Sequence, residues 1–365
     1  MAATGQSVLI TGVAGNLGTR LLPMLADFSV IGADMHEPPD GSLQEFHSLD
    51  LGEEESCTAL VEILRQHRPL AVVHLAFVID PVRNGVLDLD RMWRINVAGT
   101  ARVVEAIAES NRMGGAIRKF IHLSSVSAYG PETPFPVPED YELNAKTLPY
   151  ALHKEESDEV VRLRAPSLGE CTTYVLRPHI FTGATMQNYL VGALRGTPGG
   201  VSHRAERMRE QGKRLPMLLP YGDEYPAKLF QFVHVDDVAR LISYILRREE
   251  RNTGVMVLNV AGRGDPVSIG RAAEMAGSKV VRLPGVWLCR MVLKMMWDRK
   301  LSAVPPEALP YMIGSYLMDT KRLKWFLGDE YEKVIRYTVE DALADSFVNL
   351  GSVGPRHGSK IATHN

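Results

Sequence analysis

The stretch ITGVAGNLGTRLL occupies residues 10–22 and places Gly12, Gly15 and Gly18 between an apolar run and an amphipathic segment. Glycine adopts dihedral angles that other residues avoid, and its missing side chain lets a ligand approach the backbone closely. A strand that ends at Thr11 and turns sharply into a helix would aim backbone N–H groups and the positive end of the helix dipole at an anion. The stretch therefore predicts a phosphate-binding turn between a strand and a helix.

Short apolar runs alternate with helix-like segments through the first half of the chain. Each run is rich in β-branched residues and is bounded by turn-forming residues, which is the pattern of a buried strand. Residues 15–27 and 99–113 carry apolar side chains three and four positions apart, as an amphipathic helix does. We therefore predict an α/β fold with a doubly wound parallel sheet of the Rossmann type. The predicted strands span residues 7–11, 28–34, 70–76, 119–125 and 172–178.

The second predicted strand ends at Asp34, which lies 22 residues after Gly12. At about this spacing the Rossmann fingerprint places a carboxylate that hydrogen-bonds the ribose hydroxyls of a bound dinucleotide. Met35 and His36 follow Asp34, so no arginine stands where a 2′-phosphate would need one. The sequence predicts NAD as the cofactor and disfavours NADP.

The second half of the chain lacks this regular alternation and is richer in loops. We predict an NAD-binding Rossmann domain over residues 1–182, with sheet and helix segments returning at about 231–262. A smaller, irregular substrate-binding lobe would take residues 183–230 and 263–350. The Gly- and Ser-rich end at 351–365 predicts a disordered tail, because it carries little apolar content to bury.

Composition and charge exclude several classes of partner. The formal net charge is −2, so the field of the whole chain favours neither nucleic acid nor an anionic membrane. The sequence shows no signal-peptide pattern and no apolar stretch long enough to span a bilayer. Cys57, Cys171 and Cys289 are scattered and match no disulfide framework or zinc motif. We predict a cytoplasmic location, a small-molecule substrate and no metal.

A second group of residues carries the chemistry. Tyr150 and Lys154 stand four positions apart in PYALHKEE, a spacing that puts both side chains on one face of a helix. A phenol with a pKa of about 10 is a poor base at neutral pH, and a nearby cation lowers that pKa by stabilising the phenolate. Ser124 and Ser125 end the predicted 119–125 strand, where doubly wound sheets place ligand groups. Either serine could hydrogen-bond the reacting oxygen.

Seven motifs in a fixed order extend these observations. They are T-G-x-x-G-x-x-G from Thr11, VVHLA at 72–76, INVAGT at 95–100, SSVSAYG at 124–130, Tyr150 with Lys154, LRP at 176–178 and FVHVDDVA at 232–239. Together they resemble the extended short-chain dehydrogenase/reductases, the NAD-dependent epimerase/dehydratase family. The resemblance implies epimerisation or oxidation and reduction at a secondary alcohol or ketone carbon of a carbohydrate-like substrate, including nucleotide sugars.

The resemblance also implies roles for individual residues. Ser125 rather than Ser124 would be catalytic, with Tyr150 as the base and Lys154 on the nicotinamide ribose. Asp50 and Leu51 would flank the adenine. The implied cofactor-binding residues are Gly12, Gly15, Asn16, Leu17, Gly18, Asp34, Asp50, Leu51, Ala76, Asn96, Lys154 and Pro178. The candidate substrate-binding residues are Ser125, Asn188, Ile180 and Phe230, whereas His234, Asp236 and Asp237 would pack beneath the site without binding a metal.

Departures from the family pattern reduce the number of possible reactions but do not identify the substrate. Ser125, Val126 and Ser127 stand where dehydratases of the family carry Thr-Asp-Glu, which disfavours elimination. Ile180 stands in place of an asparagine that contacts substrate phosphate in many relatives. Phe230 stands at the arginine that grips the diphosphate. The clamp that holds a nucleotide sugar is therefore expected to be weak.

Two alternatives to a sugar enzyme stay open. Loss of the phosphate clamp favours a dehydrogenase of an apolar secondary alcohol, similar to the 3β-hydroxysteroid branch of the superfamily. A non-catalytic dinucleotide-binding regulatory protein is disfavoured because such a protein has no use for Ser125, Tyr150 and Lys154. The basic segment 202–214 would either replace the clamp or form a solvated helix. Relatives pair through the helices that correspond to about 98–112 and 150–164, which implies a homodimer.

Overall fold

The computed structural model describes residues 5–39, 43–79, 88–249 and 253–348. The predicted tail at 351–365 lies outside the described residues. Within these ranges no helix has the length and apolar character needed to cross a membrane.

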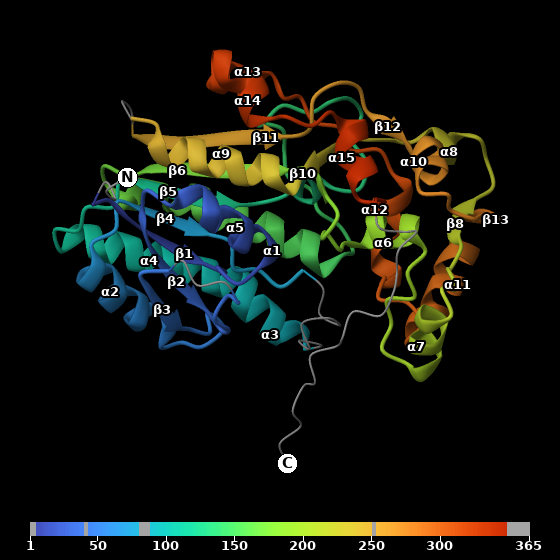
Figure 1. The fold of residues 1–365 in the computed structure, drawn as a ribbon, viewed down its shortest axis with the longest axis horizontal. Helices are drawn as coiled ribbons and strands as arrows, with labels where there is room; N and C mark the ends of the chain where they lie inside the picture. The colour runs from blue at the N-terminus through green and yellow to red at the C-terminus, as the bar shows by residue number, and fades with distance from the viewer. Residues whose placement is uncertain (1–4, 40–42, 80–87, 250–252, 349–365) are drawn as a thin grey trace.

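A seven-stranded parallel sheet forms the centre of the fold (Figure 1). Its spatial order is β11-β6-β5-β4-β1-β2-β3, and all neighbouring strands run parallel. The order reverses between β1 and β4, the switch point beyond which doubly wound sheets bind their ligands. The strands are β1 (Ser7–Thr11), β2 (Ser29–Asp34), β3 (Glu45–Ser48), β4 (Ala71–His74), β5 (Lys119–Leu123), β6 (Thr172–Pro178) and β11 (Gly254–Val260). The predicted doubly wound α/β fold is confirmed.

All five predicted strands form, with differences at their ends. The predicted 70–76 and 119–125 strands end earlier, at His74 and Leu123, because the chain leaves the sheet there to enter the loops beyond its carboxyl edge. The predicted helix at 15–27 is wrong in one respect. It is α-helical only over α1 (Asn16–Leu21) and continues as a 3₁₀ turn, because Pro23 has no N–H with which to extend the α-helical pattern.

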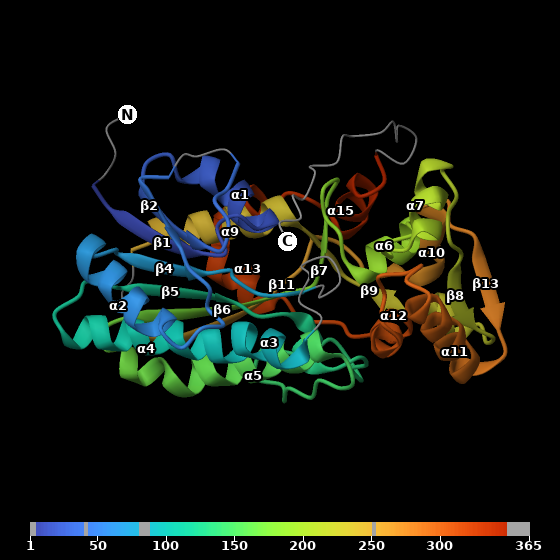
Figure 2. The ribbon, with the colours of Figure 1, turned by 90° about the horizontal axis from the view of Figure 1, so that it is seen from below.

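Helices cover both faces of the sheet. In Figure 2, α2 (Ser56–His67), α4 (Gly99–Arg112) and α5 (Pro149–Arg164) lie on one side, with the short α3 (Leu89–Trp93) beside them. On the other side lie α1, α9 (Val235–Arg247) and α13 (Lys321–Leu327). Each face buries its own apolar core, because alternate strand residues point to opposite sides.

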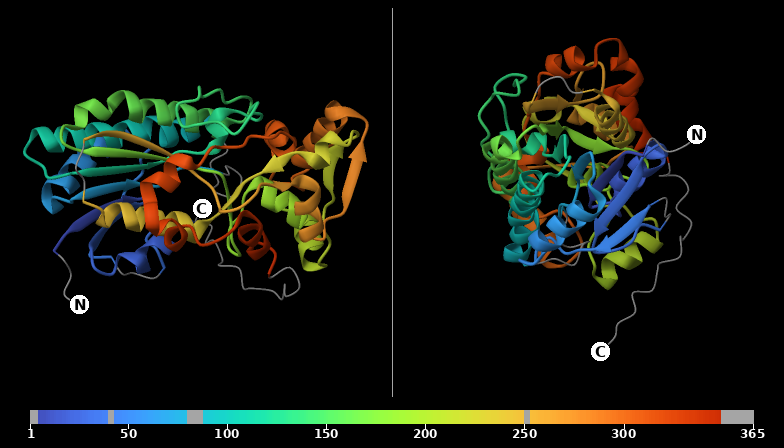
Figure 3. Two further views of the ribbon diagram at one scale, coloured as in Figure 1. Left: turned by 90° about the horizontal axis from the view of Figure 1, so that it is seen from above. Right: turned by 90° about the vertical axis from the view of Figure 1, so that its left-hand side faces the viewer.

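Smaller elements gather beyond the carboxyl ends of the strands, at the right of Figure 1 and of the left view in Figure 3. Three two-stranded sheets occur here: β10 (Phe232–His234) with β7 (Ile180–Thr182), β12 (Val267–Ser268) with β9 (Leu229–Phe230), and β13 (Val280–Leu283) with β8 (Met217–Pro220). The helices are α6 (Tyr189–Arg195), α7 (His203–Glu210), α8 (Glu224–Ala227), α10 (Ile269–Met275), α11 (Gly285–Asp298), α12 (Leu309–Ile313) and α15 (Val339–Asp345), while α14 (Tyr331–Val334) follows α13. The division into domains at residues 182 and 262 stays a prediction.

A buried ion pair joins β6 to α5. Arg177 donates from Nε to Asp158 at 2.8 Å and from a terminal nitrogen to the other carboxylate oxygen at 2.9 Å. The same guanidinium donates to the Tyr129 hydroxyl at 2.7 Å and to the Glu139 carbonyl at 2.8 Å. Both charged side chains are fully buried. The pair fixes the helix that carries Tyr150 against the sheet.

Three histidines are buried without charge. His74 lies between the hydroxyls of Thr11 and Thr100 and stacks on His122, with ring centroids 5.6 Å apart. Burial lowers the pKa of His74 to about 3 and the pKa of His122 well below its ordinary value. Burial also lowers the pKa of His179 to about 3.

These histidines make the protein sensitive to acid. The unfolded chain takes up protons near the ordinary histidine pKa, whereas the folded chain resists them until about pH 3. We expect the free energy of unfolding to fall as the pH drops below about 6.5, by up to about 1.4 kcal/mol per pH unit for each histidine. Urea unfolding at a series of pH values measures this slope, and a free energy that stays constant down to about pH 4 would contradict it.

Candidate active site

The glycine-rich turn is shaped by close backbone contacts. Gly12 has φ +74°, and a Cβ at this position would lie 2.3 Å from the Ala76 nitrogen. A Cβ on Gly18 would lie 2.4 Å from the Val13 oxygen. Neither position has room for a side chain. Gly12 has the unusual dihedral angle that was predicted, whereas Gly18 is required by close packing of α1 against the backbone of the turn. Gly15 is the N-cap residue of α1 and is less tightly enclosed. A Cβ at this position would lie 3.2 Å from the Gly12 oxygen.

A cavity of about 440 Å³ opens above this turn. The carboxylate of Asp34 accepts a hydrogen bond from the Ala14 backbone at 3.0 Å, which holds it at the edge of the turn. Asp50 accepts from the Gly52 backbone at 2.8 Å and forms an ion pair with Arg91 at 2.6 Å. The lining includes six of the predicted cofactor residues, namely Gly12, Gly15, Asp34, Asp50, Leu51 and Ala76. The shape and donors suit a dinucleotide, with its phosphates at the turn and a ribose at Asp34.

The other predicted cofactor residues lie away from this cavity. Leu17 packs its side chain into the core, and Asn16 donates its amide to Thr185 at 3.0 Å. Gly18 is buried within α1. Asn96 is buried and binds both backbone groups of Val78, at 2.7 and 3.0 Å, so its side chain holds the loop after β4.

Substitution of Gly12 tests this turn. We expect Gly12→Ala to raise the Kd for NAD at least about 100-fold, because the new Cβ collides with the β4 loop and the residue keeps a strained φ. Isothermal titration with NAD measures the effect. Gly114 has φ +87°, and a Cβ there would meet nothing within 4 Å, so Gly114→Ala carries the backbone strain alone. Unchanged NAD binding in a folded Gly12→Ala protein would contradict the assignment of the turn.

Ser125 and Tyr150 meet at a second cavity, of about 110 Å³. Ser125 follows β5 and caps the 3₁₀ turn at 126–129, where its hydroxyl oxygen accepts from the Ser127 backbone at 3.2 Å. Tyr150 lies in the first turn of α5, which begins at Pro149, and Lys154 follows one turn later. Pro178 also lines this cavity, beside the start of β7. The structure thus brings the predicted serine, tyrosine and lysine together at the carboxyl edge of the sheet.

Burial sets the protonation of this group. It raises the pKa of Tyr150 to about 12, although a hydrogen bond with Ser125 acts to lower that pKa. Burial lowers the pKa of Lys154, with Asp158 acting in the opposite direction. The Lys154 ammonium donates to the Leu123 carbonyl at 2.6 Å. In the protein without cofactor, the tyrosine is therefore a neutral phenol at physiological pH.

Phe77 is a site residue that the sequence analysis missed. The centroid of its ring lies 3.4 Å from the Lys154 Nζ atom. The same ring contacts the Tyr150 ring edge to face, with ring centroids 5.8 Å apart. Phe77 also lines the 440 Å³ cavity above the glycine-rich turn. Phe77 therefore connects the walls of the two cavities, because it lines one and contacts Tyr150, which lines the other. Its position after Ala76 in the VVHLA motif was the available signal.

Some of the predicted substrate residues line the 110 Å³ cavity, and others are buried behind its lining. Ile180 and Asn188 line the 110 Å³ cavity. The Asn188 amide oxygen accepts from Val191 at 2.9 Å and its nitrogen donates to Phe181 at 2.7 Å, so it caps α6. Phe230 is fully buried behind the wall, against His179 and Tyr316. The lining is mainly apolar, with contributions from Ile79, Val126, Leu148, Pro178, Ile180, Phe181, Met186, Leu190, Ala308 and Met312.

The basic segment 202–214 forms α7 and the loop after it. Two of its arginines hydrogen-bond backbone carbonyls of the protein itself. Arg209 donates to the carbonyls of Pro198 and Gly200 at 2.5 and 2.8 Å, and Arg214 donates to four carbonyls at the ends of α6 and α10. Arg214 thereby caps two helix C-termini, and Arg209 holds the loop before α7. Their guanidinium groups do not reach the 110 Å³ cavity lining.

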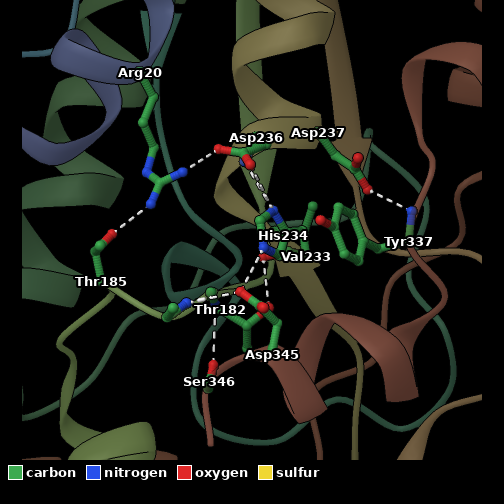
Figure 4. A network of polar contacts seen from close by, with 12 residues as sticks. Arg20, Thr182, Thr185, Val233, His234, Asp236, Asp237, Tyr337, Asp345 and Ser346 are labelled. Atoms are coloured by element: carbon green, nitrogen blue, oxygen red, sulfur yellow. Dashed lines mark hydrogen bonds and ion pairs between the residues drawn. The ribbon is translucent and has the colours of Figure 1, made fainter. Parts of the chain in front are cut away.

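His234, Asp236 and Asp237 each have protein partners (Figure 4). His234 bonds Asp345 at 3.1 Å, Asp236 pairs with Arg20, and Asp237 accepts two backbone N–H bonds from the segment before α15. Arg20 in turn donates to a threonine of the loop after β7 at 2.7 Å. The network ties α1, α9 and α15 together beneath the site. Among the described residues these three do not form a metal-binding group.

A Rossmann sheet with a glycine-rich turn, an aspartate at the end of β2 and a Ser-Tyr-Lys set is typical of an NAD-dependent enzyme of the extended short-chain dehydrogenase/reductase type. The chain belongs to the NAD dependent epimerase/dehydratase family, whose model matches residues 8–261. The predicted family, the NAD cofactor and the enzymatic function are confirmed, and the non-catalytic alternative is set aside.

Sugar-nucleotide epimerases are among the similar proteins. A UDP-glucose 4-epimerase of Pisum sativum is 27% identical over 305 residues, covering 78% of this chain and 85% of the relative. A UDP-glucose 4-epimerase of Erwinia amylovora is 26% identical over 253 residues, covering 64% and 71%. UDP-glucuronic acid 4-epimerase from Bacillus cereus, solved with UDP-glucuronic acid and NAD, has a TM-score of 0.64 at 18% identity, covering 96% of this chain and 100% of that chain.

Proposed function

We propose that this protein is an NAD-dependent epimerase that inverts a secondary alcohol carbon of a UDP-sugar, at C4 of the sugar ring. The observation that carries the proposal is the meeting of Ser125 and Tyr150 at a cavity whose Tyr150 contacts Phe77, a residue that lines the dinucleotide groove. The similarity to UDP-glucose 4-epimerases supports the choice of sugar and carbon.

NAD, when bound, supplies the carbon that accepts and returns hydride. Tyr150 removes the proton from the sugar hydroxyl through its phenolate oxygen and later returns it. Ser125 holds the same sugar oxygen in register by hydrogen bonding. Burial raises the pKa of Tyr150 to about 12, and the hydrogen bond with Ser125 opposes this. We infer that the positive charges of Lys154 and of the oxidised cofactor would lower the pKa further. Each side chain thus has one task, and the proton moves only between the substrate oxygen and Tyr150.

The shape of the cavity bears on epimerisation. An epimerase must expose both faces of the oxidised carbon to the same hydride donor, so the sugar must turn within the pocket. Apolar walls such as Ile180 and Met312 make few directional hydrogen bonds that would fix one orientation. This property suits a ring that has to rotate between two half-reactions.

Product analysis tests the proposal. The purified protein is incubated with NAD and, separately, with UDP-glucose, UDP-galactose and UDP-glucuronic acid, and the nucleotide sugars are separated by chromatography. We expect conversion of at least one of them to its C4 epimer, with no net accumulation of NADH. Failure with all three, together with NAD binding, would overturn the UDP-sugar assignment and leave the cofactor assignment intact.

A second candidate function is supported by the same cavity wall. Ile180 and Phe230 stand where many relatives carry an asparagine and an arginine for phosphate, and the cavity lining is mainly apolar. An NAD-dependent dehydrogenase of an apolar secondary alcohol would fit such a lining. Net NADH formation with a 3β-hydroxysteroid, and none with UDP-sugars, would favour this candidate.

The protein is also proposed to be a cytoplasmic homodimer. Three free cysteines support a reducing compartment. On the outer helical layer α4 and α5 lie side by side, and Leu163 on α5 exposes 78% of its surface. Burial of this leucine against a second copy would remove apolar area from water. Light scattering of the purified protein measures the mass and thereby the number of subunits.

A further inference from the structure

Two histidines and a glutamate converge at the edge of the sheet, on the face covered by α2. Glu45 and His47 stand two apart on β3, so their side chains leave the strand on the same face. His67 is the last residue of α2, which packs on that face. The Nε2 atoms of the two histidines lie 3.2 Å apart, and the glutamate oxygens lie 3.4 Å from His47 Nε2 and 3.5 Å from His67 Nε2.

Each of these separations is close to that between neighbouring ligands of a bound metal ion. With metal–ligand bonds of about 2.0–2.1 Å, neighbouring ligands of a tetrahedral zinc ion lie about 3.3 Å apart. The two Nε2 atoms already stand at that spacing, and each has one of the two Glu45 oxygens at a similar distance. With one ligand atom from each residue, all three atoms lie within 4.8 Å of one another. Two imidazoles with one carboxylate form a donor set that binds Zn²⁺, with a water molecule completing the tetrahedron.

The fold keeps these ligands in place and open to solvent. β3 is held by its parallel register with β2, in which Ile31 pairs with Glu45 and Ala33 with His47. The end of α2 is held by a hydrogen bond from the Ser7 hydroxyl to the His67 carbonyl at 3.1 Å. Side-chain exposure rises from 8% for His67 to 21% for His47 and 43% for Glu45, so an ion can enter from the glutamate side.

We propose that Glu45, His47 and His67 form a Zn²⁺ site that pins the edge strand β3 to the end of α2. The site is separate from Ser125 and Tyr150 and has no part in hydride transfer. Its function is structural, because β3 is the short outer strand of the sheet and contacts only β2 by strand pairing. A zinc ion that binds the folded protein and not the unfolded chain stabilises the folded protein by mass action.

Zinc titration of the full-length protein tests the site. We expect one Zn²⁺ per chain by isothermal titration with a zinc salt, and a rise in the melting temperature on zinc addition. His47→Ala and His67→Ala should each weaken binding at least about 100-fold, and Glu45→Gln should weaken it about 10-fold or more. His203→Ala is the matched control, since His203 is fully exposed on α7 and should leave binding unchanged.

Cobalt provides a second readout that does not depend on stability. Co²⁺ in a tetrahedral site gives intense visible absorption, and we expect this in the wild type and not in His47→Ala or His67→Ala. Zinc binding of equal strength in the wild type and both histidine variants, or no stoichiometric binding by the wild type, would overturn the proposal. In that outcome the histidines only hydrogen-bond one another. Neither result depends on the identity of the substrate.

Discussion

Tyr150→Phe is expected to lower kcat roughly a thousandfold while leaving the Kd for NAD nearly unchanged. The substitution removes only the phenolic oxygen, so the ring keeps its edge-to-face contact with Phe77. Tyr150 does not line the dinucleotide cavity, so loss of its oxygen removes no contact there. What is lost is the group that we propose to carry the proton of the substrate hydroxyl.

Steady-state kinetics with a UDP-sugar and titration with NAD measure the two effects. Tyr221 is largely exposed and outside both cavities, so Tyr221→Phe should be indistinguishable from the wild type. A Tyr150→Phe enzyme that keeps more than about a tenth of wild-type kcat would contradict the assignment, because loss of a general base costs at least about a hundredfold.

The pH dependence follows from the buried phenol. Without cofactor, burial raises the pKa of Tyr150 to about 12, so the phenolate is scarce near neutral pH. Binding of the positively charged, oxidised cofactor stabilises the phenolate and lowers this pKa. Ultraviolet difference spectra of wild type minus Tyr150→Phe should therefore titrate at lower pH with NAD present, and the rate should rise with pH through that lowered pKa.

Arg177→Met is expected to lower the free energy of unfolding by about 3–5 kcal/mol, the cost of leaving a buried charge without its partner. Asp158 is fully buried, and the Arg177 hydrogen bonds hold its pKa below the ordinary value in spite of its desolvation. Because the folded pKa is depressed, the pair stabilises the protein above the ordinary aspartate pKa, and this stabilisation is lost as the pH falls. Urea unfolding at neutral and acidic pH measures both effects.

Two variants separate charge from packing. Arg177→Met with Asp158→Leu removes both charges and should recover part of the loss, since no buried charge remains unpaired. Arg118 and Glu170 form an exposed pair, and Arg118→Met should cost less than about 1 kcal/mol. If Arg177→Met cost no more than Arg118→Met, the buried pair would not be what fixes α5 to the sheet.

Local patterns predicted the features that depend on nearby residues. Gly12 and Asp34 belong to one strand–turn–helix–strand unit, so their spacing alone indicated a dinucleotide site. Tyr150 and Lys154 share a helix, so periodicity placed them together. The fold class followed from alternation of apolar runs, but Pro23 shortened the first helix and the short edge strand β3 carries no buried run that a pattern could reveal.

Features built by tertiary contact were not predictable in this way. Phe77 contacts Lys154 from a segment distant in the sequence, and Arg91 on α3 reaches Asp50 in the loop after β3. Asn188 lines the 110 Å³ cavity and its amide also caps α6, a contact that the sequence did not indicate; its binding of substrate stays a prediction. The ligands of the proposed zinc site come from a strand and a helix end, a spacing that matches no short metal motif.

We propose that hydride leaves and returns to one carbon while Tyr150 carries the proton. UDP-galactose labelled with deuterium at C4, incubated with the protein and NAD, tests it most directly. Nuclear magnetic resonance of the product should show UDP-glucose with deuterium retained at C4, and Tyr150→Phe should form almost none. Loss of the label to solvent, or label-retaining conversion that persists in Tyr150→Phe, would contradict the account.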